Sequence, residues 1–237
     1  MSESGDKIVF KNMGLTIHYK ISTPRKLTLA AVKELITPLH AKAVKIGLAE
    51  VGELLEVGPD FPSAWHFPRG AKTAADVLPP SAGWLFCAHP GEGSEGVLMG
   101  LCRYEKVSGW RLQGFCKTQY ASCNGWEHFL KCHRGVIELL WAAEDLGLRL
   151  KVHDEGELWE TGSHARLRRK LNEYNQCVAA FGGALKDAAG AAGLTVQSEI
   201  HNHPDFERLE ASGMAALGER IDSAVRVVKR LASESIS

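Results

Sequence analysis

Six polar residues have side chains that could act together in acid–base or metal chemistry. Each falls at or near the end of a predicted element, where reactive groups usually lie. A lysine and an amide beside carboxylates can polarise a substrate oxygen, bind a metal ion or transfer protons. A histidine adds a group that gains or loses a proton near neutral pH. We predict a polar catalytic site formed by His89, Lys117, Gln119, Asp154, Glu155 and Glu160.

The strand–helix–strand block within residues 109–160 must position most of this site. Its segments are a predicted strand over 110–120, an amphipathic helix over 124–146 and a strand over 148–152. Strand alternation places Lys117 and Gln119 on one face, and the block predicts that this pair lies near Asp154 and Glu155. The carboxylates would then act as general base or metal ligands, while the lysine stabilises negative charge. The alternative is a solvated, salt-bridged rim without chemistry.

A second polar group, His201, His203 and Asp205, could ligate zinc or another divalent ion. The two imidazoles face together only if the segment is extended, as Pro204 favours for the residue before it. A polar surface loop is the alternative, because metalloenzyme motifs such as H-E-x-x-H are absent from the sequence. His133 lies on the apolar stripe of its helix, and we interpret it as a core residue satisfied by a hydrogen bond.

Three motifs carry a family resemblance: a strand-borne His89-Pro90, the segment KTQYA at 117–121, and DEGELWE at 154–160. Together they resemble an uncharacterised family of bacterial proteins that has K-T-Q-[FY]-A and D-E-G-x-x-W-E motifs and no assigned activity. The resemblance covers residues 15–162 and implies that these motif residues matter, without implying a reaction. The sequence departs from the family at Glu157-Leu158, where a small residue and an aromatic residue are expected.

The remaining elements complete an α+β fold. Alternating or continuous apolar residues predict further strands over 15–22, 49–57, 84–89 and 97–104. Apolar residues at helical spacing predict helices over 32–46, from Ser163 and from about Met214. We expect a kink or a division at Pro38, a cap at Asn124, and little regular structure in the proline-rich segment 58–83. The order predicts a largely antiparallel sheet covered by helices on one face. A C-terminal helical pair over 163–237 would pack on a body over 1–162, within one structural domain.

Composition and charge narrow the function classes. Lysine plus arginine and aspartate plus glutamate number 28 each, so no net charge attracts nucleic acid or anionic lipid, although a local basic patch remains compatible with this balance. We expect no nucleic-acid partner and no membrane. The acidic start and the six cysteines without a C-x-x-C pair predict a cytoplasmic protein with free thiols.

Two functions from different classes fit these observations. The first is an enzyme, most simply a hydrolase, that uses the six polar residues; the second is a non-catalytic module that binds a small ligand or another protein. We also predict a two-fold dimer through the apolar face of the last helix, formed by Met214, Leu217, Ile221, Val228 and Leu231. An intramolecular helical hairpin is the competing explanation for that face.

Overall fold

The structure is a computed structural model that describes residues 15–23, 26–61, 66, 77–191 and 198–234. Contacts divide the chain into two units: Thr16–Arg168, and Met1–Leu15 together with Arg169–Ser237. The first unit holds an antiparallel sheet and its covering helices. The second unit is helical in its described part.

The described residues of the first unit form a seven-stranded antiparallel sheet. Its strands are β1 (Thr16–Thr23), β2 (Glu50–Val51), β3 (Leu55–Val57), β4 (Pro80–His89), β5 (Val97–Tyr104), β6 (Val107–Lys117) and β7 (Arg149–Asp154). The order is β2-β4-β5-β6-β1-β7, with β3 also paired to β4. The first strand therefore lies between two strands that come much later in the chain. The predicted α+β class with an antiparallel sheet is confirmed.

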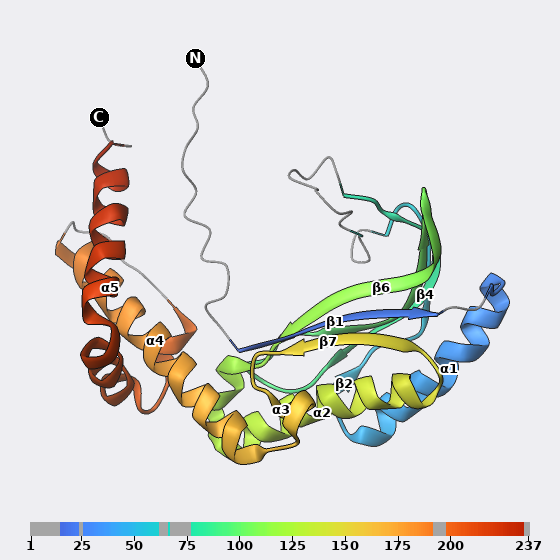
Figure 1. Ribbon diagram of the computed structural model, residues 1–237, viewed down its shortest axis with the longest axis horizontal. Helices are drawn as coiled ribbons and strands as arrows, with labels where there is room; N and C mark the ends of the chain where they lie inside the picture. Colours follow the sequence, from blue (N-terminus) through green and yellow to red (C-terminus); the bar gives the residue numbers. More distant parts are fainter. Residues whose placement is uncertain (1–14, 24–25, 62–65, 67–76, 192–197, 235–237) are drawn as a thin grey trace. The chain divides into compact units, whose positions relative to one another are not determined.

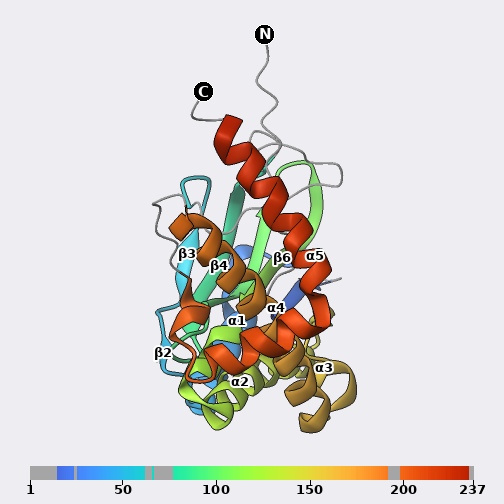
Figure 2. The same ribbon diagram turned by 90° about the vertical axis from the view of Figure 1, so that its left-hand side faces the viewer.

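Two long helices cover one face of this sheet, as Figures 1 and 2 show. Helix α1 (Leu29–Ile46) buries Val32, Ile36, Leu39 and Ala43, which recur at helical spacing. Helix α2 (Trp126–Asp145) buries a wider stripe that includes His133. The short helix α3 (Leu158–Thr161) follows β7. The opposite face of β1, β6 and β7 carries exposed polar side chains, so this part of the sheet is open.

Strand β1 shows how sequence alternation separates the two faces. Ile17, Tyr19 and Ile21 are buried, whereas His18 and Lys20 are exposed. The Tyr19 ring lies against Gly114 of β6. Its hydroxyl then reaches the backbone of Leu98 on β5, donating to the carbonyl (2.7 Å) and accepting from the N–H (3.1 Å). Burial raises the pKa of this phenol far above its ordinary value, so it stays protonated.

Several predicted boundaries differ from the structure. Helix α1 continues through Pro38 as one helix, because the buried residues on both sides of the proline hold one stripe against the sheet. The single strand predicted over 49–57 is two short strands, β2 and β3. Most of the proline-rich segment 58–83 lies outside the described residues, although its last residues begin β4.

The end of β6 differs in a way that affects the predicted site. The strand stops at Lys117, and residues Gln119–Asn124 form the 3₁₀ helix η3. Helix α2 is preceded by Gly125 at φ 90°, not capped by Asn124, and no side chain makes a capping hydrogen bond there. The cap predicted at Asn124 is therefore wrong: Asn124 belongs to the preceding 3₁₀ turn.

The second unit contains a helical hairpin. Its long helices are α4 (His164–Ala191, of which Arg169 onward lies in this unit) and α5 (Phe206–Glu234), with the 3₁₀ helix η4 (Glu199–Asn202) before α5. A Cβ at Gly213 would collide with the Gln176 carbonyl, so the helix backbones approach closely. Met214 and Leu217 pack against a cluster around Ala180. The hairpin, stated above as the alternative for this face, is thus present for these residues, and association of two copies stays a prediction. Helix α5 also begins earlier than predicted, at Phe206.

No helix in the described part of the chain combines the length and apolarity needed to cross a membrane.

Candidate functional site

The strand pairing separates the six residues predicted to form one catalytic site. His89 ends β4, and Asp154 ends β7. Four strand spacings lie between these strands in the sheet order, which at ~4.8 Å each is about 19 Å. His89 is instead paired with Glu50 of β2. A single reacting group could not contact both His89 and Asp154 at that separation.

Lys117 and Asp154 lie on opposite faces of the sheet. Thr16 pairs with Lys117, and its neighbour Ile17 pairs with Asp154. Paired residues point to one side of a sheet and successive residues to opposite sides, so Lys117 belongs to the open face and Asp154 to the helix-covered face. The prediction that Lys117 and Gln119 share a face near both carboxylates is corrected by this register and by the 3₁₀ turn that buries Gln119.

Asp154 is the centre of a buried hydrogen-bond network. It is 2% exposed, and its carboxylate accepts the backbone N–H groups of Gly156 (2.8 Å), Leu158 (2.8 Å) and Trp159 (3.1 Å). It also accepts from Nε2 of His133 at 3.2 Å. Burial alone would raise the carboxyl pKa, but the hydrogen bond and charge of His133 and the two backbone donors at Trp159 and Gly156 lower it below its ordinary value.

His133 links this carboxylate to a third polar group. Because ionised Asp154 can only accept, Nε2 carries a proton, and Nδ1 is hydrogen-bonded to the Thr118 hydroxyl at 2.8 Å. The order hydroxyl, imidazole, carboxylate is that of a nucleophilic triad. Thr118 and His133 are both 0% exposed, however, so a substrate has no access to the hydroxyl. The network holds the end of β6, α2 and the turn after β7 together, and the prediction that His133 is a satisfied core residue is confirmed.

The other two carboxylates bind backbone near the same turn. Oε2 of Glu155 accepts the Thr16 N–H (2.9 Å), and Oε1 lies 3.8 Å from Nε2 of His18. Glu160 is exposed and accepts the Asp154 N–H at 3.3 Å. These contacts give both residues a local structural task. The catalytic role predicted for the six residues stays a prediction, and their geometry divides them among separate places.

Lys117→Ala and Glu160→Ala should each change the free energy of unfolding by less than ~1 kcal/mol, because exposed side chains of this kind contribute little to stability. Lys117 is half-exposed and Glu160 is exposed. Urea denaturation of the two variants measures this directly. A loss above ~2 kcal/mol at either position would indicate a structural role comparable with a buried group.

The predicted metal ligands of the second unit are engaged separately. Nδ1 of His203 accepts the Asp205 N–H at 3.1 Å, and Asp205 forms an ion pair with Arg208 at 3.0 Å. The His201 ring packs edge-on against Phe206, with centroids 5.2 Å apart. Within the described ranges, no group of three histidine, cysteine or acidic side chains is placed to hold a metal ion.

The open sheet face carries a cluster that sequence reasoning did not identify. Because β1 pairs with both β6 and β7, the side chains of this cluster lie in rows across the three strands. One row is Phe115, His18 and His153, the next is Gln113, Lys20 and Lys151, and the third is Arg111, Ser22 and Arg149. Lys117 lies one row further, beside Thr16. We call the first three rows the open-face rows.

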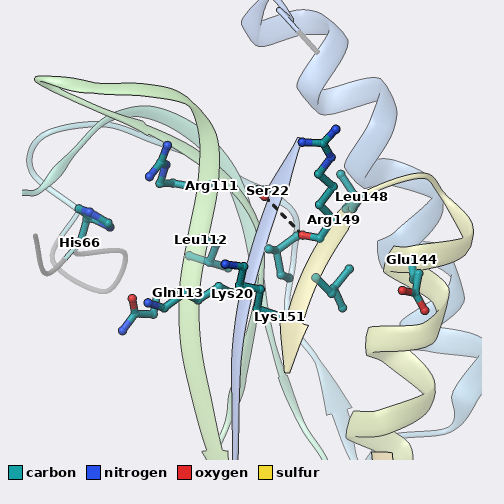
Figure 3. A pocket seen from close by; sticks show the side chains of 12 residues that line it. Lys20, Ser22, His66, Arg111, Leu112, Gln113, Glu144, Leu148, Arg149 and Lys151 are labelled. Atoms are coloured by element: carbon teal, nitrogen blue, oxygen red, sulfur yellow. Dashed lines mark hydrogen bonds between the residues drawn. The ribbon is translucent and has the colours of Figure 1, made fainter. Parts of the chain in front are cut away.

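A pocket of about 660 Å³ is lined by side chains of the two polar rows together with Glu144 of α2 from the helix-covered side (Figure 3). It is lined by Lys20, Ile21, Ser22, His66, Arg111, Leu112, Gln113, Glu144, Leu148, Arg149, Leu150 and Lys151. The lysine and arginine side chains come from the sheet itself, whereas the one acidic residue, Glu144, projects from α2. The pocket therefore presents four cations beside one carboxylate, one amide and one hydroxyl.

The positive charges of this pocket are not paired with carboxylates among the described residues, although the Arg111 guanidinium donates to the Ser108 carbonyl. None of Lys20, Arg111, Arg149 and Lys151 forms an ion pair with a described carboxylate, and Nε of Arg111 is buried without a hydrogen-bond partner among the described residues. Lys20 and Lys151 are directly paired, an arrangement of like charges that destabilises a sheet. Burial, followed by the charges of Arg111 and Lys20, lowers the pKa of His66.

The sequence did contain a signal for this cluster. Basic or polar residues occupy every second position of β1 and β7, for example Lys20 and Ser22 on β1, or Arg149 and Lys151 on β7, and Arg111 and Gln113 follow the same alternation on β6. Such alternation predicts an outward polar face but not which strands are neighbours. Only the position of β1 between β6 and β7 brings the charges into one pocket.

Comparison of the chain with protein-family models, with curated proteins and with solved structures finds no match in any of the three.

Proposed function

We propose that this protein is a binding module for an anionic ligand, which it holds in the basic pocket of the open sheet face. The observation that carries the proposal is the set of four cations, Lys20, Arg111, Arg149 and Lys151, that line one pocket and lack an ion-pair partner among the described residues. Like charges held together cost stability unless an anion neutralises them. A ligand that carries several negative charges supplies that neutralisation.

The pocket chemistry supports binding more than hydrolysis. Guanidinium and ammonium groups bind phosphate or carboxylate oxygens through charge-assisted hydrogen bonds, and the Gln113 amide and Ser22 hydroxyl can complete such a site. Hydrolysis through the six residues predicted from the sequence would need them to converge on one cavity. Their separation by strand register supports the second of the two functions considered, the non-catalytic ligand-binding module.

Inorganic tripolyphosphate should bind the full chain at low salt, and each of Lys20→Gln and Arg149→Gln should weaken the affinity about tenfold. A charge-assisted hydrogen bond contributes ~1.5–3 kcal/mol, and about 1.4 kcal/mol corresponds to a factor of ten. Isothermal titration calorimetry measures the affinities. Binding should also raise the melting temperature, because the ligand relieves the repulsion between Lys20 and Lys151.

The matched control is Lys131→Gln, which removes the same charge from an exposed position on α2, on the helix side of the sheet. Its affinity for tripolyphosphate should stay within about twofold of the unmodified protein, as expected for a remote surface charge. Absence of binding at low salt, or an equal loss in Lys131→Gln and Lys20→Gln, would contradict a site on the open face.

A further inference from the structure

The first of the open-face rows adds aromatic rings to the basic pocket. Phe115 is 58% exposed although it lies within a strand. The His18 ring lies between its two partners in the row: its centroid is 6.3 Å from that of Phe115, tilted by 42°, and 6.2 Å from that of His153, stacked at 14°. One exposed apolar residue on a surface needs no explanation. Three rings in one row across three strands form a platform.

The spacing of the rows matches aromatic and ionic contacts made by one extended ligand. Rows two residues apart on a strand are ~6.8 Å apart. The ring row is followed by the Lys20 row and then by the Arg111 row, so cations begin one step from the rings and continue beyond them. Lys117, the next residue after Phe115 on this face of β6, adds a cation on the other side of the ring row. The ring row is thus flanked by positive charge along the strands.

We infer that the anionic ligand is a single-stranded nucleic acid, whose bases stack on Phe115, His18 and His153 while its phosphates bind the lysine and arginine side chains of the neighbouring rows. This inference rests on the proposed function and specifies its ligand. Exposed rings on a basic surface are the combination that binds unpaired strands, because every base has a face that stacks. A duplex keeps those faces covered by its own stacking. An acidic peptide carries negative charges but has no regularly spaced aromatic rings that could stack on the ring row.

The balanced net charge of the chain does not oppose this ligand. Phosphates interact with the local field, which is screened over ~10 Å at about 0.1 M salt, and not with the total charge of the molecule. The open-face rows carry four cations, and Lys117 adds a fifth beside them. Of the nearby acids, Glu144 lines the pocket from α2, and Glu155 is already bound to the Thr16 N–H and lies close to His18. The positive charge is therefore a local patch on the open face, which the balanced composition of the chain permits.

The experiment is fluorescence anisotropy with a fluorescein-labelled twelve-residue oligothymidylate, in parallel with tripolyphosphate titrations of the same proteins. Phe115→Leu keeps an apolar strand residue but removes the ring. It should weaken oligonucleotide binding about tenfold, a typical loss when one base loses its stacking partner. It should leave tripolyphosphate affinity unchanged. A slope of about −3 in log affinity against log salt is expected for roughly four phosphate contacts.

Trp141→Leu is the matched aromatic control, because Trp141 is 41% exposed on α2. It should bind the oligonucleotide like the unmodified chain, and His153→Ser serves as a second variant of the ring row. Three results would overturn the inference. The protein could bind poly-glutamate of the same charge as tightly as oligothymidylate, it could bind a duplex as tightly or more tightly, or neither ring variant could change the affinity for the oligonucleotide. If tripolyphosphate binding and its dependence on Lys20 persist in that case, the proposed anion site stands and only the nucleic acid is excluded.

Discussion

Asp154→Asn should lower the free energy of unfolding by about 3–5 kcal/mol, the range for removal of one partner from a buried charged network. The carboxylate is the common acceptor for three backbone N–H groups and for His133. An amide keeps the size of the side chain but replaces one acceptor oxygen by a donor, so at least one buried N–H group would face another donor. The turn after β7 and its contact with α2 should loosen together.

The pH dependence of this loss has a defined sign. The pKa of Asp154 is lower in the folded protein than in the unfolded chain, so its contribution is present above the unfolded value and is lost as the pH falls through the folded value. The stability difference between the unmodified protein and Asp154→Asn should therefore be full at about pH 7 and shrink below about pH 4, where an unfolded aspartate begins to protonate.

Urea denaturation at about pH 7 and about pH 3.5 measures both effects, and Asp145→Asn provides the control. Asp145 ends α2 in an exposed position, so its amide variant should lose less than ~1 kcal/mol at either pH. An Asp154→Asn variant as stable as the control near neutral pH would show that the network does not hold the turn.

Gly114→Val should cost about 4 kcal/mol, because a side chain at this position displaces the Tyr19 ring and separates its hydroxyl from Leu98. Overpacking of a filled core typically costs ~1–3 kcal/mol, and a buried hydroxyl left without partners adds ~1–3 kcal/mol. Tyr19 is 1% exposed, so its ring is enclosed by neighbouring atoms. The glycine is thus required by close approach of a ring, not by its backbone conformation.

Gly58→Val is the matched control, since a Cβ at Gly58 would meet no atom within 4 Å. Thermal and urea denaturation of both variants should show that Gly58→Val lowers the free energy of unfolding by less than ~1 kcal/mol. A second test asks whether the losses at Gly114 and Tyr19 are additive. Gly114→Val combined with Tyr19→Phe should cost clearly less than the two single losses together, because the hydroxyl is already gone. Additive losses would indicate that Gly114 acts independently of Tyr19.

Local pattern was sufficient to predict most elements of the fold. Buried and exposed residues alternate along the strand around Tyr19, and buried residues recur at helical spacing along α1, so each element shows a single period over many residues. The stop at Lys117 could not be predicted, because the residues that follow it continue the strand pattern and form η3 only in the context of buried contacts such as those of Gln119. Local sequence pattern does not predict structure that depends on tertiary contacts.

The site depended on register, which local pattern does not determine. Asp154 and Glu155 are adjacent in sequence and were expected to act together, yet alternation at the end of β7 sends one to the core and the other to the open face. The open-face rows required the pairing of β1 with two strands distant in sequence. Basic residues that are dispersed along the chain thus become neighbours only in the folded sheet.

Strand β7 stands last in the sheet order, so its outer edge faces no other strand of the described chain. An exposed edge can pair with a strand of a second molecule and so begin aggregation. Arg149 and Lys151 project from this strand, and charged side chains on an edge oppose such pairing. The same cations that we assign to ligand binding therefore also protect the edge. Selection for a less basic pocket would carry a cost in solubility, which limits how far this surface can change its ligand.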